Sequence, residues 1–331
     1  MRLLFGRERF TAEIAWQELG PLLPGWELTV SPPDRVIEHL DGVDAICSFG
    51  ARIDAAVLAA GTFGIVHQFG VGLEKIDVER ATELGVWVCR VPGDAGGNAD
   101  SVAEFAVLHL LVMVRRLDDA RAALTERRWA FRPAGGSLSG MTVLIVGLGA
   151  IGTALAARLA PFGVRLLGVR AHPELGGPAG MDLVGGPAEL PDLLSKADAV
   201  VCCAMFDAST EGMFGSAEFA AMKPGALFVN VARGGMVDEA ELLAALESGQ
   251  IGGAGLDVHA TEPADPGSAL LRHPLVLATP HIGGLTEPMF RRTGVVFAAN
   301  LQAWADGRTP EWAVNQPEHC RWSASGPPPA G

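Results

Sequence analysis

The chain has 331 residues, of which 49% are hydrophobic and 19% are charged, and its formal net charge is −13. This length suggests about two domains that can each bury a core, so the composition excludes a chain that is mainly disordered. Acidic residues number 38 against 25 basic ones, which leaves no broad cationic surface for nucleic acid or for an anionic membrane. A local basic pocket for one small anion is compatible with this balance.

The cysteines are few, odd in number and irregularly spaced, and they form no C-x-x-C motif. Such a set indicates reduced thiols. The first residues place Arg and Glu where a signal peptide needs an apolar centre, and no uncharged apolar run reaches the roughly 18 residues of a membrane span. We therefore expect a cytoplasmic protein.

The first hundred residues alternate short apolar runs with helical patterns, which is typical of βα units. Residues 43–49, 65–69 and 86–91 are predicted to be buried parallel strands. Two helices are predicted between them, each with an Asp at its start and a glycine after its end. These are residues 54–60 and 77–84, and together with the strands they predict a small doubly wound unit.

A segment without Pro or Gly, residues 101–129, predicts one continuous helix. A helix of about 28 residues spans roughly 40 Å, which is longer than one small domain needs. It can therefore connect two domains or two subunits. Residues 131–140 follow with the Gly, Ser and Pro content of a domain boundary.

A second βα series begins after this boundary, with strands that are apolar on both faces. The predicted strands are residues 142–146, 165–169, 199–203, 227–231, 253–258 and 276–278. Six such strands make a full dinucleotide-binding sheet. The last helix, residues 288–306, is expected to pack on the first unit. Residues 323–331 contain few large apolar side chains, so we expect them to form a disordered tail.

The first strand of the second series leads into a G-x-G-x-x-G motif at Gly147, Gly149 and Gly152. Three glycines alone are weak evidence, but the strand before them and the helix and strand after them are the context that a dinucleotide site requires. The first glycine allows the turn, the second lets the pyrophosphate approach the backbone, and the third lets helix and strand pack closely. The amides of Ala150 and Ile151 then meet the anion at the helix N-terminus. The alternative is a glycine-rich turn that binds nothing.

The residue at the end of the second strand favours NADP over NAD. NAD-binding proteins usually carry Asp or Glu there, whereas this chain has Arg170, with His172 close behind. A guanidinium pairs with the 2′-phosphate of NADP, while a carboxylate repels it. The alternative is that Arg170 is a solvated residue at a strand end.

Three charged side chains follow successive late strands, at the edge where a doubly wound sheet binds its ligands. They are Arg233, Glu262 and His281. Arg can bind two carboxylate oxygens, and a His beside a Glu can exchange a proton near neutral pH. Taken one at a time, each has a simpler explanation. Arg233 can form a surface ion pair, Glu262 can be an acid at the start of a helix, and His281 can be a buried imidazole. Jointly they predict a site that reduces keto acids, with His259 as a weaker candidate for the acid.

Several long motifs in order resemble the D-isomer-specific 2-hydroxyacid dehydrogenase family. They are FGVGLEKID from Phe69, NADSVAE from Asn98, the GLGAIG turn, NVARGGMVDE from Asn230, GAGLDVHATEP from Gly253, TPHIGG from Thr279 and Val314 with Asn315. The match covers nearly the whole chain. It implies two doubly wound parallel-sheet domains: a discontinuous, flavodoxin-like substrate domain of residues 1–103 and 283–317, and a Rossmann domain of residues 104–282, followed by a disordered tail at 318–331.

The resemblance also implies roles for individual residues. Arg233 would orient the substrate, His281 would be the general acid and base, and Glu262 would be its partner. The resemblance further implies a set of binding residues: the backbone of Gly70, Val71 and Gly72 for the substrate carboxylate, Asp257 for the nicotinamide carboxamide, and Ala204 and Ala232 for the cofactor cleft. It implies a homodimer whose interface includes the helix after Ser101, and no metal is expected.

The chain departs from the family pattern at three places. Ala204-Met-Phe-Asp207 replaces the usual Leu-Pro-Leu-Thr, which puts Asp207 in doubt as a ligand. Phe69 precedes the Gly-Val-Gly turn where a polar residue is usual, and Arg90 replaces a small or amide residue. Both can alter substrate choice, and Arg90 either contacts a second anionic group of the substrate or faces solvent.

These patterns predict a dehydrogenase of D-2-hydroxy acids that passes a hydride between the nicotinamide C4 and the substrate C2. One alternative is an enzyme for a phosphorylated or phosphonate-bearing hydroxy acid, which Arg90 permits. Another is a regulator that senses nucleotides on the same fold without turnover. An intact set of Arg, Glu and His favours chemistry over regulation.

Overall fold

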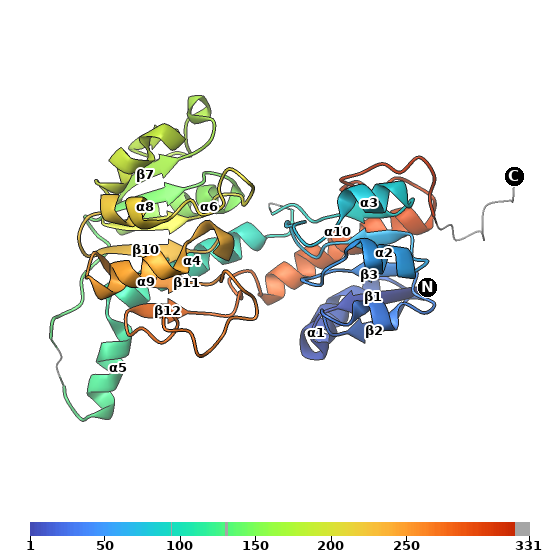
Figure 1. Ribbon diagram of the computed structural model, residues 1–331, viewed down its shortest axis with the longest axis horizontal. Helices are drawn as coiled ribbons and strands as arrows, with labels where there is room; N and C mark the ends of the chain where they lie inside the picture. The colour runs from blue at the N-terminus through green and yellow to red at the C-terminus, as the bar shows by residue number, and fades with distance from the viewer. Residues whose placement is uncertain (94, 130–131, 322–331) are drawn as a thin grey trace, which may run out of the picture. The chain divides into compact units, whose positions relative to one another are not determined.

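The computed structural model describes residues 1–93, 95–129 and 132–321. The chain forms two compact units. Unit 1 comprises Met1–Asn98 and the chain from Leu285 onward, and unit 2 comprises Ala99–Gly284. In each unit, helices flank a parallel sheet (Figure 1).

Unit 1 contains a five-stranded parallel sheet with the order β2-β1-β3-β4-β5. Its strands are β1 (Arg2–Gly6), β2 (Glu27–Ser31), β3 (Ala45–Cys47), β4 (Ile65–His67) and β5 (Trp87–Cys89). The last three lie within the predicted runs. The first two, β1 and β2, were not among the predicted strands. In the case of β2 the reason is that the strand is only partly buried, so its sequence lacks an apolar run.

The helices of unit 1 are α1 (Arg9–Leu19), α2 (Ala55–Ala60), α3 (Val78–Glu83) and α10 (Glu287–Ala305). Helices α2 and α3 begin at the aspartates that the sequence predicts. The Asp54 side chain accepts hydrogen bonds from two amides of α2, and the Asp77 side chain accepts one from an amide of α3. α10 packs with α1 on one face of the sheet, where Phe290, Phe297 and Trp304 join the core around Leu3 and Phe5. A second apolar cluster fills the opposite face.

Unit 2 contains a seven-stranded parallel sheet with the order β12-β11-β10-β9-β6-β7-β8. Its strands are β6 (Thr142–Val146), β7 (Arg165–Val169), β8 (Leu183–Gly185), β9 (Ala199–Cys202), β10 (Ala226–Asn230), β11 (Ile251–Leu256) and β12 (Val276–Ala278). Six of them match the predicted strands to within two residues. The seventh, β8, is a three-residue edge strand that was not predicted.

The helices of unit 2 are α4 (Asn98–Val114), α5 (Leu117–Thr125), α6 (Ala150–Leu159), α7 (Leu190–Leu194), α8 (Ser216–Ala221) and α9 (Glu239–Glu247). Buried residues of α4 and α6 pack on one face of the sheet with Val143 and Val201. Phe214, Phe219 and Phe228 lie in the cluster on the other face. The sheet is therefore covered on both faces, as its apolar strands predict.

The prediction of one continuous helix over residues 101–129 is wrong. The chain leaves helical geometry at Arg116, whose φ is 50°, and α5 starts at the next residue. Arg116 is held there by Asp119 at 2.7 Å and by the carbonyl of Pro133 at 3.2 Å. α5 buries Ala123 alone and projects away from the sheet of its unit (Figure 1).

The start of the predicted tail packs on unit 1. Arg321 donates from its amide to the Gly85 carbonyl at 2.8 Å and from its side chain to the Leu58 carbonyl at 2.6 Å. Its guanidinium also lies 5.7 Å from the centre of the Phe63 ring. These contacts hold the chain as far as Arg321, and the rest of the predicted tail lies outside the described residues.

All five cysteines lie within the described residues, where none forms a disulfide, and four of them are buried. Burial raises the pKa of Cys89 and of Cys202 to about 12, and it raises the pKa of Cys47 and Cys203 well above the ordinary range. Cys320 is exposed. Among the described helices, none is long and apolar enough to span a bilayer.

Candidate active site

Three predicted charged residues follow three neighbouring strands of unit 2. Arg233 comes after β10, Glu262 after β11 and His281 after β12, and these strands are adjacent in the sheet. Because the strands are parallel, their carboxyl ends lie at one edge, which is where doubly wound sheets bind ligands.

His281 and Glu262 are hydrogen-bonded to each other at this edge. His281 Nδ1 lies 3.1 Å from Glu262 Oε1 and 3.0 Å from Oε2. The His281 side chain is 42% exposed and that of Glu262 is 31% exposed, so the imidazole is accessible while one of its nitrogens is engaged. An imidazole that is oriented by a carboxylate can exchange a proton through its other nitrogen.

Arg233 is anchored through its own backbone. The Asn230 side chain donates to the Arg233 carbonyl at 2.9 Å and accepts from the Ala232 amide at 3.0 Å. Arg233 Nη1 donates to the Ala232 carbonyl at 2.8 Å. Asn230 is 1% exposed, so a buried amide fixes the turn that carries this half-buried guanidinium.

Asp257, at the end of β11, is buried and accepts hydrogen bonds from the peptide that carries His281. Its carboxylate accepts from the amides of Ile282 at 2.9 Å and Gly283 at 2.8 Å. It also accepts from the Thr279 hydroxyl at 2.7 Å. The role expected from the resemblance, a contact with the nicotinamide carboxamide, stays a prediction.

His259, the alternative acid, lies in a different environment from His281. It is 7% exposed, and its Nε2 donates to the Thr279 carbonyl at 2.9 Å. A buried imidazole whose Nε2 faces a backbone carbonyl is not positioned to exchange protons with a ligand. The geometry therefore favours His281 as the acid.

The glycine turn between β6 and α6 has the space that a dinucleotide needs. A side chain at Gly147, whose φ is 99°, would meet the backbone of Ala204 at 2.4 Å, and one at Gly152 would meet the Gly147 carbonyl at 2.0 Å. At Gly149, by contrast, a Cβ atom would have no neighbour within 4 Å. The two outer glycines thus allow close packing, and the middle one leaves open space at the N-terminus of α6, where the amides of Ala150 and Ile151 lie. These residues fit a bound pyrophosphate.

The other predicted cofactor residues lie in the same unit. Arg170 directly follows β7 and donates to the Gly176 carbonyl at 2.8 Å. Ala204 lies beside the glycine turn, and Ala232 is 5% exposed. The Asp207 carboxylate accepts from the amide and the hydroxyl of Ser209, and these bonds lower the pKa of Asp207, whose own amide donates to the Thr210 hydroxyl.

The predicted substrate loop belongs to unit 1 and follows β4. The Gly70 carbonyl accepts from the amide of Val91 at 2.9 Å, and Val71 is 36% exposed. Arg90 lies directly beside this contact and is half-buried. Phe69 is 2% exposed and packs with other aromatic rings, so its side chain belongs to the core and can alter substrate choice only through its neighbours.

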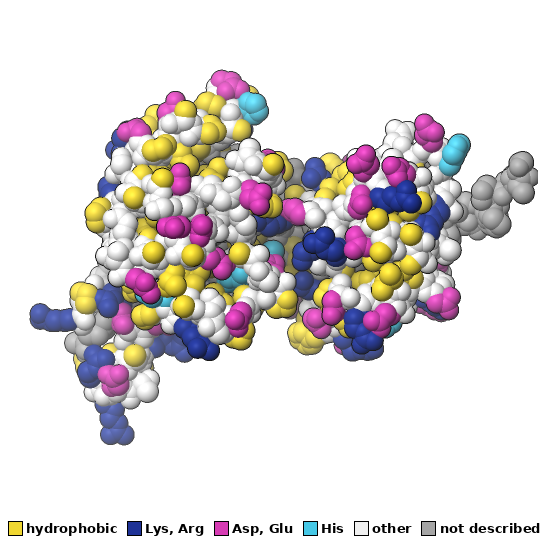
Figure 2. Space-filling model, in the orientation of Figure 1, with side chains coloured by type: hydrophobic (Ala, Val, Ile, Leu, Met, Phe, Trp, Pro, Cys, Tyr) yellow, Lys and Arg dark blue, Asp and Glu magenta, His cyan; other side chains and the backbone are white. Residues whose placement is uncertain are grey.

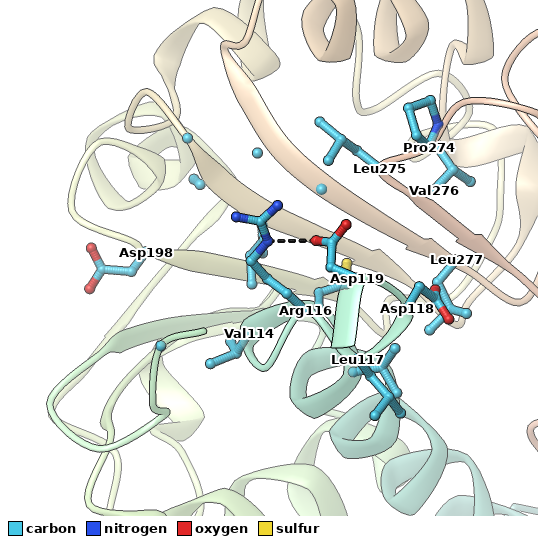
Figure 3. Close-up of a pocket in the computed structure, with 18 of the residues that line it drawn as sticks. Val114, Arg116, Leu117, Asp118, Asp119, Asp198, Pro274, Leu275, Val276 and Leu277 are labelled. Carbon is cyan, nitrogen blue, oxygen red and sulfur yellow. Dashed lines mark hydrogen bonds and ion pairs between the residues drawn. The ribbon is translucent and has the colours of Figure 1, made fainter. Parts of the chain in front are cut away.

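A cavity of about 580 Å³ lies at the opposite end of the unit 2 strands. Figure 3 shows Arg116 paired with Asp119 on one side of it and the chain around Leu275 on the other. Its lining includes Asp198 and Ala226, which precede or begin strands, so it is distinct from the edge of His281. Among the described residues, no group of three His, Cys, Asp or Glu side chains can hold a metal ion.

On the face shown in Figure 2, acidic and basic side chains are interspersed without one continuous basic patch. This distribution agrees with the acidic composition of the chain.

Two further contacts of the structure were not predicted. His109, in α4, lies next to Thr279, and His259 binds the carbonyl of the same threonine. The contact of His109 depends on which helix packs against β11, and no local pattern encodes that. A polar residue in the apolar stretch of α4 was the available signal.

An open glycine turn and a carboxylate-paired imidazole at the carboxyl edge of one sheet are typical of nicotinamide-dependent dehydrogenases that act on hydroxyl groups. The comparisons with known proteins agree. Residues 107–283 match the family described as D-isomer specific 2-hydroxyacid dehydrogenase, NAD binding domain.

Among curated proteins, the chain is 36% identical to the D-3-phosphoglycerate dehydrogenase of Mycobacterium tuberculosis, over 85% of this chain and 53% of that protein. The chain thus spans about half the length of such relatives. It is 34% identical to the glyoxylate reductase of Korarchaeum cryptofilum, over 92% of this chain and 95% of that one. Among solved structures, the NADPH-dependent glyoxylate/hydroxypyruvate reductase of Sinorhizobium meliloti has a TM-score of 0.79 at 29% identity, covering 96% of this chain and 99% of that one.

The chain belongs to the D-isomer-specific 2-hydroxyacid dehydrogenase family. Its relatives are oxidoreductases that act on CH–OH groups with a nicotinamide cofactor. The predicted fold class, two parallel-sheet α/β domains, is confirmed.

Proposed function

We propose that the protein is an NAD(P)-dependent D-2-hydroxyacid dehydrogenase, which also reduces 2-keto acids, with His281 as acid and base. The observation that carries this proposal is the pairing of His281 Nδ1 with both oxygens of Glu262, one strand away from Arg233. The open turn at Gly149 supports a dinucleotide in the same unit.

In reduction, the substrate carbonyl carbon gains a hydride and its oxygen gains a proton. A bound NAD(P)H supplies the hydride at the nicotinamide C4. His281 delivers the proton from Nε2, because Nδ1 faces Glu262. The Glu262 carboxylate accepts from Nδ1 and fixes the orientation of the ring. In the reverse direction the same nitrogen takes the proton from the hydroxyl group.

Arg233 binds the substrate and stabilises charge that grows on the carbonyl oxygen. Its guanidinium carries a permanent charge and can hold two oxygens at once. Because Asn230 fixes its backbone, this charge is in place before the substrate arrives. The backbone of Gly70, Val71 and Gly72 holds the substrate carboxylate, as the family resemblance implies, while Ala204 and Ala232 line the cofactor cleft.

The cofactor we favour is NADP. Arg170 follows β7, where a carboxylate would select NAD, and one of its terminal nitrogens is tied to Gly176. That bond fixes the guanidinium while leaving other N–H groups for a 2′-phosphate. The NADPH-dependent reductase of Sinorhizobium meliloti, a structural relative, is in keeping with this preference.

The direct test is turnover with a panel of 2-keto acids, in which the absorbance of reduced nicotinamide is followed with NADPH and NADH in parallel. We expect turnover with at least one acid and a preference for NADPH. Absence of turnover with every acid and both cofactors would overturn the proposed activity. A clear preference for NADH would overturn the role of Arg170 alone.

A second candidate substrate is a phosphorylated or phosphonate-bearing 2-hydroxy acid. Arg90 is a half-buried cation directly beside the backbone contact of Val91 with Gly70, in the predicted substrate loop. Relatives named D-3-phosphoglycerate dehydrogenase point in the same direction. Including phosphohydroxypyruvate in the panel separates a phosphorylated substrate from an unphosphorylated one. Arg90→Ala should raise the KM for phosphohydroxypyruvate and leave the KM for glyoxylate unchanged.

We also infer a homodimer through the surface of α4 and α5. Leu108, Leu117 and Leu124 are 48%, 43% and 66% exposed there, which is unusual for leucines along two successive helices. Light scattering of the purified chain should give twice the chain mass, and Leu124→Glu should lower the measured mass.

The reduced thiols are in keeping with a cytoplasmic location.

A further inference from the structure

The peptide that carries His281 has an unfavourable backbone conformation. His281 has a φ of 55°, in the left-handed region that side chains other than glycine rarely adopt. Its amide donates to the Asp257 carbonyl at 2.7 Å and to the Thr279 carbonyl at 3.0 Å. The next two amides bind the Asp257 carboxylate. Contacts outside this peptide must therefore hold it in place.

Thr279 is the residue through which other elements reach this peptide. Its hydroxyl donates its one hydrogen to Asp257 Oδ1 at 2.7 Å. His109 Nε2 lies 3.5 Å from the same hydroxyl oxygen, and His259 Nε2 lies 2.9 Å from the Thr279 carbonyl. Two imidazoles, from α4 and from the end of β11, thus contact one threonine two residues before His281.

These contacts determine which nitrogen of each imidazole carries the proton. A carbonyl oxygen can only accept, so His259 Nε2 is protonated. The Thr279 hydroxyl has given its hydrogen to Asp257, so it can only accept from His109 Nε2–H. Each ring therefore donates to Thr279 from Nε2.

The other nitrogen of each ring indicates that these are not ordinary core residues. His109 is fully buried and His259 is 7% exposed, and within the described residues Nδ1 of both lacks a hydrogen-bond partner. Burial lowers the pKa of His109 to about 4, although Asp257 opposes the shift, so its ring is neutral at pH 7. A buried polar atom without a partner destabilises a fold, so an apolar side chain would be the more stable choice here.

The shape of β11 also accommodates His109. A Cβ atom at Gly255 would lie 2.4 Å from His109 Nδ1, so the ring packs directly on the strand backbone. The Phe105 ring, one turn earlier in α4, contacts His109 edge to face with centroids 4.9 Å apart. The imidazole is thus confined on two sides, with its Nε2 directed at Thr279.

We propose that His109 and His259 are positioning residues, which act through Thr279 and Asp257 to hold His281 in its left-handed conformation. The inference rests on the proposed function, in which His281 is the acid and base. Neither imidazole transfers a proton to the substrate.

The test compares His109→Leu and His259→Leu with His109→Gln and His259→Gln, since glutamine retains a donor near the position of Nε2. We expect each Leu variant to lower kcat on the order of ten-fold, because small displacements of a reacting group are costly, with the KM for NADPH unchanged. The Gln variants should recover most of the rate. Thr279→Val should have an effect of similar size, and adding His109→Leu to it should cost nothing more.

Leu110→Ala serves as the control, because it removes a fully buried side chain from the same helix without touching Thr279. It should lower Tm and leave kcat at wild-type level below the transition. A role in packing alone would make the His109 variants behave in the same way. Wild-type kcat in the Leu variants, or a loss that Gln does not recover, would overturn the proposal.

A measurement without turnover separates this proposal from the proposed function. Hydrogen exchange of the Ile282 and Gly283 amides, together with the NMR titration of the His281 ring, reports the peptide directly. We expect faster exchange and a shifted His281 titration in the Leu variants, and neither in Leu110→Ala. If the wild type turns over no substrate but these shifts occur, the activity fails and the positioning stands. Unchanged exchange and titration in the Leu variants would overturn the positioning.

Discussion

The two units share an architecture but differ at the carboxyl edges of their sheets. Unit 2 places Arg233, Glu262 and His281 after three adjacent strands, and buried Asn230 and Asp257 hold the turns of the first and the last. Unit 1 places a glycine-containing loop after β4, beside buried aromatic rings. The same fold therefore places charged side chains at this edge in one unit and a glycine-containing loop at this edge in the other.

The aromatic cluster of unit 1 makes this difference concrete. The Phe69 ring lies 5.2 Å from Phe49 and 6.0 Å from Phe290, and the Arg7 guanidinium lies 5.2 Å from the Phe49 ring centre. Phe49 itself has a positive φ of 26°. These rings pack against one another at the start of the loop after β4, for which we propose substrate binding through the backbone.

The largest expected effect comes from His281, which we propose as the acid in unit 2. His281→Ala should lower kcat by about 10² to 10⁴, the usual contribution of a general acid or base. Binding of NADPH, measured by fluorescence titration, should stay near the wild-type value. A variant with the wild-type rate would show that the edge of unit 2 does not supply the proton.

Arg233 should come next. Arg233→Ala removes a preorganised donor, which typically costs ~3–4 kcal/mol in the transition state, or about 10²-fold to 10³-fold in kcat. Arg272→Ala is the matched control, because Arg272 is an exposed arginine of the same unit. Equal steady-state parameters for the two variants would contradict the proposed role.

Stability at low pH should depend on a buried histidine in each unit. Burial lowers the pKa of His67 to about 3 and of His109 to about 4, whereas imidazole in an unfolded chain titrates near 6.5. Between these values the unfolded chain binds more protons, so stability is full above the unfolded pKa and is lost as pH falls. At pH 4.5 the loss should be about 2–3 kcal/mol for each histidine.

Urea unfolding at pH 7 and pH 4.5 measures this loss. His67→Gln should reduce the pH dependence, because glutamine does not titrate and can still bind Asn300, the partner of His67 Nε2 at 3.0 Å. A variant that loses as much stability as the wild type between the two pH values would contradict the assignment for unit 1.

A smaller effect is expected at Arg170. Arg170→Ala should lower kcat/KM for NADPH by about ten-fold, since a hydrogen bond to a charged group contributes about 1.5–3 kcal/mol. The value for NADH should hardly change. Kinetics with both cofactors check this ratio, and an equal loss for both would indicate a structural role.

The smallest effect should come from the substrate loop. Val71→Ala keeps the backbone and removes an exposed side chain, so KM should change by less than about three-fold, within the range of surface substitutions. Steady-state kinetics with the preferred keto acid give the answer. A loss comparable to that of Arg233→Ala would mean that unit 1 also binds through side chains.

Much of the fold followed from local pattern. Continuous apolar runs located most strands, and Asp54 and Asp77 marked helix starts that the structure confirms. The edge strands β2 and β8 were missed because partly buried strands have weaker apolar patterns. The break at Arg116 was missed because a left-handed arginine has no Pro or Gly to signal it.

The site was predictable to a similar extent. Charged residues after successive strands identified Glu262 and His281, since the topology of a parallel sheet brings strand ends together. The contact of His109 with Thr279 depends on how α4 packs against β11. Packing of this kind joins residues 170 positions apart, which no local pattern encodes.

The distribution of thiols gives the chain a built-in labelling position. Four cysteines are buried with raised pKa values, while Cys320 is exposed. A maleimide dye added to the native protein at neutral pH will therefore attach at Cys320, because alkylation needs an accessible thiolate. A single fluorophore near Arg321 can then follow the unfolding of unit 1 without engineered cysteines.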